Sequence, residues 1–499
     1  MSFNSYIFIF LFLPLTICGW YALNYIKKYR MALAFLALMS MWFYGYFNPY
    51  YLLIMIGSIL CNFALSLVLE KAQTKNSKLI STCVLIAGVA INLGILFYFK
   101  YYDFFIENVN ALFKVDFTLR HIVLPLGISF FTFQQLSFII DRTQGKAKHY
   151  DLIEYATFVS FFPQLVAGPI VLHSEMMQQF EDIEKRAFNA ENFYRGVISF
   201  TLGLGKKVLL ADTLAILANY GFDNTLYLDS FSSLLVLAAY TLELYFDFSG
   251  YSDMAIGLGL MFGISLPQNF NSPYKAASLK ELWSRWHMTL TRFMSLYVYY
   301  PLGGNRKGKA RTLLNIFIVF VLSGLWHGAA WTYVCWGILT GLIVIWDNLY
   351  IVGFDKNAKH PAKVVLPRWI GNILTVMCFS ALLIVFRSES LTAAGRMFAD
   401  LTKGWTGNVF KTCAVFDIPE IYVLEQAVSV IAPMCSEYVR LAAALIYVLI
   451  GAFICTRKNT AEIIASKADK KSVLVFTVII LVYSIVSFSQ VSTFIYFNF

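Results

Sequence analysis

The sequence predicts an all-α, polytopic integral membrane protein. Of its 499 residues, 59% are hydrophobic and only 14% are charged, whereas roughly 25% of the residues of an average soluble domain are charged. Apolar runs of about 20 residues, the length that crosses a bilayer as a helix, recur along the chain. We therefore expect a single membrane-embedded domain over residues 1–499, with about 11–13 membrane helices.

The net charge of +10 is distributed as membrane topology requires. The first five expected spans are 6–25, 31–48, 50–69, 79–99 and 121–140. Lysine and arginine clusters follow the first, third and fifth of these spans, at 27–30, 71–78 and 142–148. Because basic loops stay on the cytoplasmic side, this pattern favours a membrane protein over a nucleic-acid-binding one. It also predicts an N-terminus outside the membrane.

The middle of the chain is less regular. Residues 155–172 are apolar, but Pro163, Gly168 and Pro169 divide them into pieces too short to span, which predicts a re-entrant or bent segment buried in protein. Apolar residues at spacings of three and four over 277–300 predict an amphipathic helix along the cytoplasmic interface. Further helices are expected at 192–219, 228–264, 312–330, 331–350, 369–387, 439–456 and 473–495, with an external segment at 388–438 that carries short helices of its own.

His327 is the first candidate for a catalytic residue. It is the single histidine of the otherwise uncharged apolar run 320–341, and ionisable groups at membrane depth mark functional sites because they are costly there. A neutral imidazole in an apolar tunnel can act as a general base for a hydroxyl. The alternative is a structural histidine that forms a hydrogen bond with a neighbouring helix.

His287 is the second candidate, forty positions upstream. Its neighbours Arg285 and Trp286 could hold an anionic or phosphate-bearing donor by charge and by stacking. The alternative is an anchor of aromatic and basic residues at the membrane interface.

Polar residues also cluster within the apolar segment 244–255. Such groups must face a cavity or pair internally, so we expect Asp247 to fix packing and Asp253 to orient a histidine or a basic residue. Asn269 follows as an amide that can form hydrogen bonds. The expected substrate-binding set comprises Tyr245, Asp253, Asn269, Arg285, Trp286 and Trp326.

The eight cysteines and six histidines show no spacing typical of a metal site or a disulfide framework. The sequence also lacks a GxSxG motif, a P-loop and a dinucleotide-binding fingerprint. We therefore expect no metal and no bound cofactor. A lipid or sugar transporter stays open as an alternative, although no internal repeat supports it.

The residues around both histidines resemble the membrane-bound O-acyltransferase (MBOAT) family, in its alginate O-acetyltransferase branch. The resemblance is carried by residues 285–341, which begin RWHMTLTRF and contain SGLWHGAAW. Four further blocks follow the family order: LPLGISFFTFQQLSFIID at 124–141, FFPQLVAGPI at 161–170, LGLGKKVLLAD at 202–212 and YFDFSGYSDMAIGLGLMFGI at 245–264. The core motifs thus cover about 120–350.

This resemblance implies a ring of helices around a central tunnel, with the family's invariant histidine at His327 and its second histidine at His287. It implies transfer of an acetyl group from a cytoplasmic thioester, acetyl-CoA or an acyl carrier, to an extracytoplasmic polysaccharide such as alginate, with a periplasmic partner protein. Peptidoglycan O-acetylation and teichoic-acid D-alanylation are alternatives with the same chemistry. The expected location is the bacterial cytoplasmic (inner) membrane.

Overall fold

A computed structural model describes residues 1–349, 352–353, 364–432, 435–468, 470–488 and 494–495. The described chain is almost entirely helical, and its strands are one short parallel pair, β1 (Val352–Gly353) and β2 (Val364–Val365). Contacts divide the described chain into two compact units: residues 1–201, 251–268, 488 and 494–495 form the first, and the described residues of 202–250 and 269–487 form the second. The expectation of a single domain over 1–499 stays a prediction.

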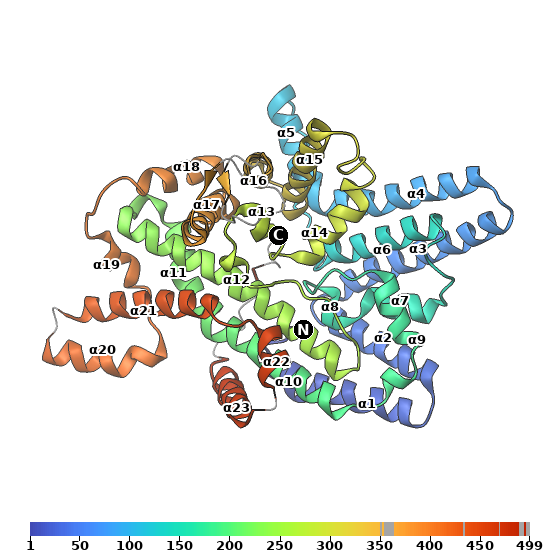
Figure 1. Ribbon diagram of the computed structural model, residues 1–499, viewed down its shortest axis with the longest axis horizontal. Coiled ribbons are helices and arrows are strands. Elements are labelled where there is room, and N and C mark those ends of the chain that lie inside the picture. The colour runs from blue at the N-terminus through green and yellow to red at the C-terminus, as the bar shows by residue number, and fades with distance from the viewer. Residues whose placement is uncertain (350–351, 354–363, 433–434, 469, 489–493, 496–499) are drawn as a thin grey trace. The chain divides into compact units, whose positions relative to one another are not determined.

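The first unit contains the expected N-terminal spans. Its helices are α1 (Leu13–Tyr25), which follows a π-helical turn at Phe8–Phe12, α2 (Tyr29–Gly45), α3 (Pro49–Thr74), α4 (Lys78–Leu96), α5 (Tyr102–Phe113) and α6 (Ile128–Thr143). Helices α3, α4 and α6 lie side by side (Figure 1). Asn62 of α3 and Asn92 of α4 exchange hydrogen bonds of 3.2 and 2.7 Å between their side-chain amides. This pairing satisfies two buried polar groups inside an apolar helix pair.

The segment predicted to be broken, residues 155–172, consists of short buried pieces. Helix α7 (Leu152–Ser160) is followed by the four-residue α8 (Phe162–Leu165) and then by a turn. A Cβ atom at Gly168 would lie 2.8 Å from the carbonyl oxygen of Pro163, so the turn requires glycine. Helix α9 (His173–Glu181) follows. The prediction that proline and glycine divide this segment is confirmed.

The second unit begins with a long helix that changes its pitch. Helix α10 (Ala190–Gly205), which starts in the first unit, continues through a π-helical turn at Lys206–Ala211 into α11 (Asp212–Asp223). Helix α12 (Ser230–Met261) likewise contributes residues to both units. Asp229 precedes it as a fully buried capping residue, and its side chain accepts hydrogen bonds from the backbone N–H groups of Ser232 and Thr406 at 2.9 and 3.0 Å.

The amphipathic helix expected over 277–300 is not continuous, and this prediction is wrong. Helix α13 (Leu279–Trp283) ends before His287, and α14 (Met288–Met294) begins after it and continues as a π-helical turn at Ser295–Tyr299. His287 has a left-handed backbone conformation, with φ of 45°. An α-helix cannot pass through such a residue. The spacing of apolar residues therefore predicted the buried face of this segment but not the break within it.

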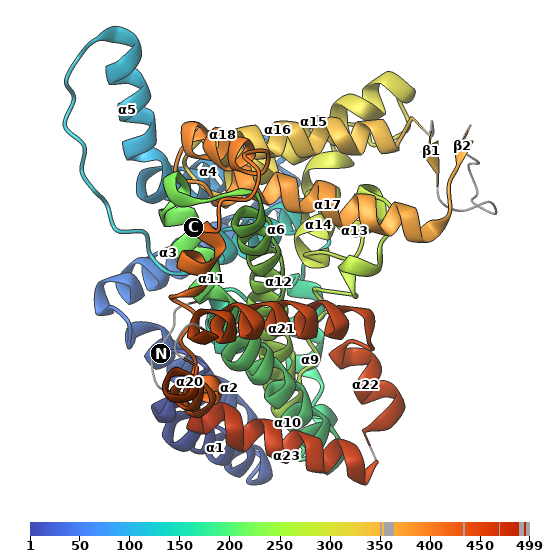
Figure 2. The ribbon, with the colours of Figure 1, turned by 90° about the vertical axis from the view of Figure 1, so that its left-hand side faces the viewer.

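Helices α15 (Lys309–His327), α16 (Trp331–Asp347) and α17 (Arg368–Arg387) pack one against the next (Figure 2). Small residues bring α15 and α16 together. A Cβ atom at Gly337 would lie 2.6 Å from the carbonyl oxygen of Phe320 and 3.2 Å from the Cα atom of Gly324. This close crossing fixes the end of α15, where His327 lies.

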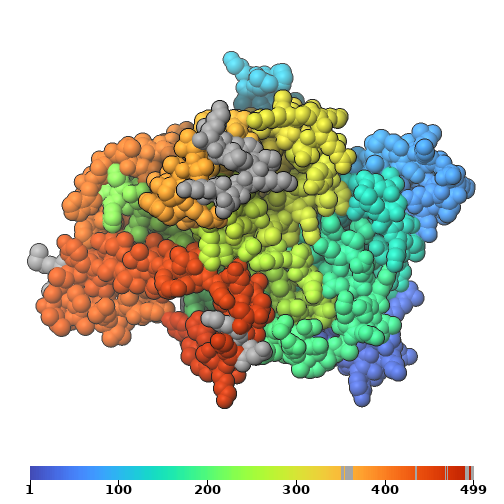
Figure 3. Space-filling model, viewed as in Figure 1, coloured from blue at the N-terminus to red at the C-terminus, as the bar shows by residue number. Residues whose placement is uncertain are grey.

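Short helices occupy the predicted external segment 388–438: α18 (Leu391–Asp400), α19 (Asn408–Cys413) and α20 (Pro419–Ile431). Helix α20 packs against α21 (Ser436–Thr456). The two helices form the orange-to-red surface at the left of Figure 3. Helices α22 (Thr460–Lys467) and α23 (Lys471–Val486) complete the described chain. The span expected at 473–495 extends in part outside the described residues.

Within the described ranges, seven helices are long and apolar enough to cross a membrane: Phe8–Tyr25, Pro49–Thr74, Lys78–Phe113, Ser230–Met261, Lys309–His327, Arg368–Arg387 and Ser436–Thr456. Trp331–Asp347 and Lys471–Val486 are apolar but shorter. The protein is a multi-pass membrane protein with an all-α fold.

Candidate active site

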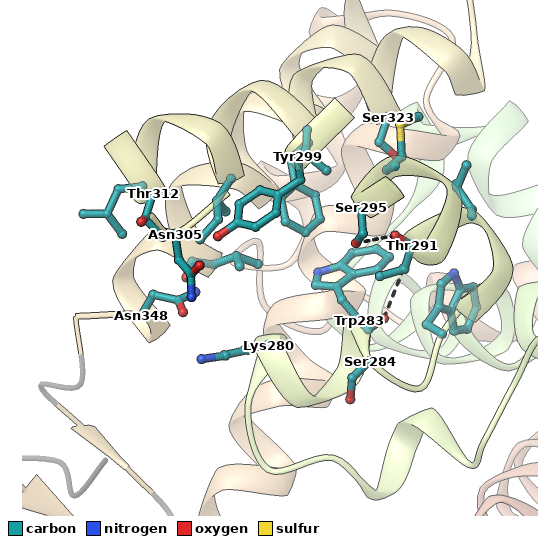
Figure 4. A pocket seen from close by; sticks show the side chains of 18 of the residues that line it. Lys280, Trp283, Ser284, Thr291, Ser295, Tyr299, Asn305, Thr312, Ser323 and Asn348 are labelled. Atoms are coloured by element: carbon teal, nitrogen blue, oxygen red, sulfur yellow. Dashed lines mark hydrogen bonds between the residues drawn. The ribbon is translucent and has the colours of Figure 1, made fainter. Parts of the chain in front are cut away.

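A cavity of about 760 Å³ lies in the second unit, between α13, α14, α15 and α16 (Figure 4). Both candidate histidines, His287 and His327, line it. They come from segments forty residues apart, and the structure therefore brings together the two residues that sequence analysis selected separately.

His287 is held by Asn269. Its Nδ1 atom lies 3.1 Å from Asn269 Oδ1, which also accepts hydrogen bonds from the N–H and the hydroxyl of Thr289, at 3.3 and 2.9 Å. Because an amide oxygen only accepts, the Nδ1 atom of His287 carries the ring proton and donates it. The Nε2 atom of the neutral ring is then the basic atom.

Burial sets the charge of His287. The side chain is 2% exposed, and removal from water lowers the pKa of His287 to about 3. The imidazole is therefore neutral at physiological pH. Backbone hydrogen bonds on both sides hold the residue in its left-handed conformation: the Met288 N–H donates to the Asn269 carbonyl and the Asn271 N–H donates to the Arg285 carbonyl, each at 2.9 Å.

His327 is the last residue of α15 and is surrounded by aromatic rings. Its ring centroid lies 5.3 Å from those of Trp336 and Phe386, both in edge-to-face contact. The ring of Trp326 lies 5.0 Å from His327 and 5.9 Å from His287. Trp326 thus contacts both histidines, and the aromatic wall limits access of water to them.

The cavity has a polar, basic end. Asn305, Thr312 and Asn348 gather there, and the Lys280 side chain extends from α13 (Figure 4). Lys309 also lines the cavity. Near the middle, the hydroxyl of Ser295 donates to the carbonyl of Thr291 at 2.7 Å, and the hydroxyl of Thr291 donates to the carbonyl of Trp283 at 3.3 Å. One site therefore combines two cationic groups with an aromatic chamber that holds the histidines.

Of the predicted substrate-binding residues, Trp286 lines the cavity. Arg285 instead forms an ion pair of 2.9 Å with Glu281. The ring of Tyr245 lies 6.2 Å from that of Trp286 and is not part of the lining of the described cavity. Asn269 and Trp326 contact the histidines and are likewise absent from the lining of the described cavity. These residues support the lining side chains.

Asp253 lies in the first unit, apart from the expected set. Its backbone carbonyl accepts a hydrogen bond of 2.8 Å from the hydroxyl of Ser199, on the adjacent helix α10. It is not among the side chains that line the described cavity. The orienting role expected of Asp253 stays a prediction.

Sequence analysis missed several lining residues, among them Trp283, Ser323, Lys280 and Asn348. Trp283 belonged to the predicted apolar face of 277–300, and its position next to RWH was the available signal. Lys280 and Asn348 carry no local signal, because only packing of α13 against α16 brings them to one cavity.

Comparison with known proteins agrees with the geometry. Residues 95–388 match the MBOAT, membrane-bound O-acyltransferase family. A peptidoglycan O-acetyltransferase of Helicobacter pylori is 39% identical over an alignment of 420 residues, and the match covers 79% of this chain and 78% of the relative. A probable alginate O-acetylase AlgI of Pseudomonas aeruginosa is 39% identical over 406 residues, 80% of this chain and 74% of the relative. A teichoic acid D-alanyltransferase of Bacillus subtilis is 27% identical over 266 residues, 51% of this chain and 65% of the relative.

Proposed function

This chain belongs to the membrane-bound O-acyltransferase family, and from that premise we propose that it transfers an acetyl group from a cytoplasmic thioester to a hydroxyl of an extracytoplasmic polysaccharide. The chain is a multi-pass membrane acyltransferase. The identity of the acetyl donor, the identity of the acceptor and the orientation in the membrane are our proposals. The observation that carries the proposal is that one cavity is lined by both histidines and also by Lys280 and Lys309.

The proposed step uses His327 as the general base. The imidazole takes the proton of the acceptor hydroxyl while the hydroxyl oxygen attacks the carbonyl carbon of the acetyl thioester. A C–O bond forms, the C–S bond breaks, and the protonated imidazole returns its proton to the leaving thiolate. Acetyl ester and free thiol are the products, so atoms and charge balance without a cofactor.

His287 assists in this proposal as a neutral hydrogen-bond acceptor. Its Nδ1–H is directed to Asn269, so the Nε2 atom is the hydrogen-bond acceptor of the neutral ring. Lys280 and Lys309, which line the cavity, are the cations we expect near the phosphate groups of acetyl-CoA or of an acyl carrier.

Transfer of labelled acetyl by membrane vesicles tests the role of His327. General-base assistance is worth about 10²–10⁴ in rate, so His327→Ala should lower incorporation of label into surface glycan by that factor without preventing membrane insertion. His149→Ala is a matched control, because that histidine is half exposed and pairs with Glu70 at 2.8 Å in the first unit. Wild-type transfer by His327→Ala would refute the assignment.

Two relatives favour different acceptors. The similarity to a probable alginate O-acetylase supports an alginate-like exopolysaccharide or another surface glycan. A periplasmic partner that receives the acetyl group is part of the proposal. The similarity to a peptidoglycan O-acetyltransferase makes peptidoglycan the second candidate. Mass analysis of exopolysaccharide and of peptidoglycan from a deletion strain separates them, because only the true acceptor loses acetyl groups. Loss of D-alanine from teichoic acid would instead identify D-alanylation.

The proposed location is the bacterial inner membrane with the N-terminus outside. Single cysteines placed in the basic loops 27–30 and 71–78 of a variant without its native cysteines should be protected from an impermeant thiol reagent in intact cells. Labelling of those loops from outside would invert the topology. A transporter would move substrate without covalent transfer of labelled acetyl.

A further inference from the structure

A buried ion cluster lies in the second unit, on elements to which the proposed mechanism assigns no role. Lys207 Nζ lies 2.6 Å from Asp247 Oδ1 and 2.7 Å from Asp212 Oδ1. The Lys207 and Asp247 side chains are each 2% exposed, while that of Asp212 is 24% exposed. The cluster joins the π-helical turn at Lys206–Ala211 and α11 to the middle of α12.

Such a pair is a poor device for stability alone. Desolvation of two buried charges cancels most of their attraction, and apolar replacements of similar volume are often as stable. In some proteins, buried ionic groups instead specify one geometry, since only one arrangement satisfies them. π-helical turns also occur frequently at functional sites, because they redirect a side chain within a helix. Together these points indicate a requirement for one defined position of α12.

A short path of contacts connects the pair to the site. Phe248 follows Asp247 in α12, is 1% exposed, and meets the His287 ring edge-to-face with 4.7 Å between centroids. Phe248 also packs edge-to-face on Phe270, at 4.9 Å, beside the Asn269 that orients His287. A small rotation of α12 would move this ring against His287.

Backbone packing makes the rotation of α12 sensitive to the pair. A Cβ atom at Gly250 would lie 2.8 Å from the carbonyl oxygen of Gly203, so α10 and α12 approach closely one turn from Asp247. Gly250 therefore allows the two helices to approach closely, and the ion pair links α12 to the turn that follows α10 near this contact. Glu243, one turn before Asp247 and 3% exposed, is a further acidic group on this side of α12.

We propose that the Lys207–Asp247 ion pair is a positioning device for the site: it fixes α12 so that Phe248 holds the His287 ring in its working orientation. This inference rests on the proposed function only for its effect on turnover. The effect on the His287 ring itself is independent of the reaction.

Asp247→Asn is the decisive variant. Lys207 keeps Asp212 as its counter-charge, so the change leaves no buried charge unpaired. The chain has six histidines, and histidine-selective ¹³C and ¹⁵N labelling of the full chain in nanodiscs gives few imidazole signals, with that of His287 assigned from His287→Gln. We expect Asp247→Asn to shift or broaden the His287 signal. Transfer from labelled acetyl-CoA should show kcat about tenfold to a hundredfold lower, with KM near wild type.

Asp229→Asn is the matched control, because it also replaces a buried carboxylate, that of the residue which caps the start of α12. It should lower thermal stability but leave the His287 signal and kcat at wild-type values. Phe248→Leu should reproduce the signal change of Asp247→Asn without altering any charge. If Asp247→Asn does not fold, Lys207→Met/Asp247→Leu replaces it, since that variant removes both buried charges.

A folded Asp247 variant with a wild-type His287 signal overturns the inference, whatever its activity. A shifted signal with unchanged kcat also overturns it, because the ring would then move without consequence. Absence of acetyl transfer by the wild-type protein would instead count against the proposed function, and the signal comparison would still decide the positioning role.

Discussion

Replacement of Asn269 by aspartate tests the state of His287 most directly. The two side chains have the same shape, so all three hydrogen bonds to Oδ1 can persist: from His287 Nδ1, from the Thr289 N–H and from the Thr289 hydroxyl. Three donors stabilise the ionised form of the new carboxyl. The variant therefore places a negative charge beside His287 with little change of packing.

The distance sets the size of the effect. A unit charge 3.1 Å from Nδ1 attracts an imidazolium by about 5 kcal/mol at an effective dielectric constant of ~20, which is about four pKa units. Desolvation of the fully buried new carboxylate reduces this gain. We expect the pKa of His287, lowered to about 3 by burial in the wild type, to rise by about 2–4 units in Asn269→Asp. The ring then titrates within an accessible pH range.

Activity and spectroscopy together check this prediction. If His287 acts as a neutral acceptor, Asn269→Asp should approach wild-type transfer of labelled acetyl at pH 8 and lose about tenfold per pH unit below its new pKa. The wild type should lack this acid limb. Histidine-selective NMR follows the protonation of His287 in the same samples. A variant whose ring is protonated at pH 5 but whose rate profile matches the wild type would refute the reasoning.

Three further outcomes concern stability in detergent, measured by thermal unfolding. Gly337→Leu should destabilise the protein by about 1–3 kcal/mol and abolish acetyl transfer, because the new side chain collides with the Phe320 carbonyl where α15 and α16 cross, near His327. Unchanged stability would contradict this close packing of α15 and α16. The pKa of His287 is about 3 in the folded protein and ~6.5 in the unfolded chain. Its contribution to stability is therefore complete above pH ~6.5 and is lost as the pH falls towards 3. His287→Gln should flatten this pH dependence, and an equally steep loss of stability in the variant would contradict the prediction. Burial raises the pKa of Glu281, but hydrogen bonds from the Ala277 N–H and the guanidinium of Arg368 outweigh burial and hold this pKa below its usual value. Glu281→Gln should therefore be less stable than the wild type at neutral pH, and the difference should vanish as the pH falls through that pKa. A loss of stability that persists in acid would indicate lost packing instead.

Local chemistry explains which parts of the fold could be predicted from the sequence. The broken segment 155–172 was predicted because proline and glycine act on their own backbone, whatever surrounds them. The break at His287 was not, because its left-handed conformation depends on Asn269 and Asn271, which lie on a separate segment. The apolar spacing of 277–300 is compatible with one helix, and only those long-range hydrogen bonds exclude it.

The site shows the same division. His327 and His287 were selected as candidates from the sequence, since a histidine in an apolar run is conspicuous and the surrounding motifs resemble a known family. Arg285 was expected to bind the donor, but Glu281 lies one turn away on the helix and forms an ion pair with it. The cations that do line the cavity, Lys280 and Lys309, come from helices that only the fold brings to one place.

The sequence by itself determined that this protein is helical and crosses the membrane, because hydropathy and the need to satisfy backbone hydrogen bonds in lipid leave no other arrangement for such a chain. It also singled out His287 and His327 as candidate catalytic residues. Tertiary structure alone decided which groups meet: His287 with Asn269, Lys207 with Asp247, and both histidines in one cavity. These contacts join residues 18 to 40 positions apart, and the charge and orientation of each side chain depend on a partner that local sequence does not specify.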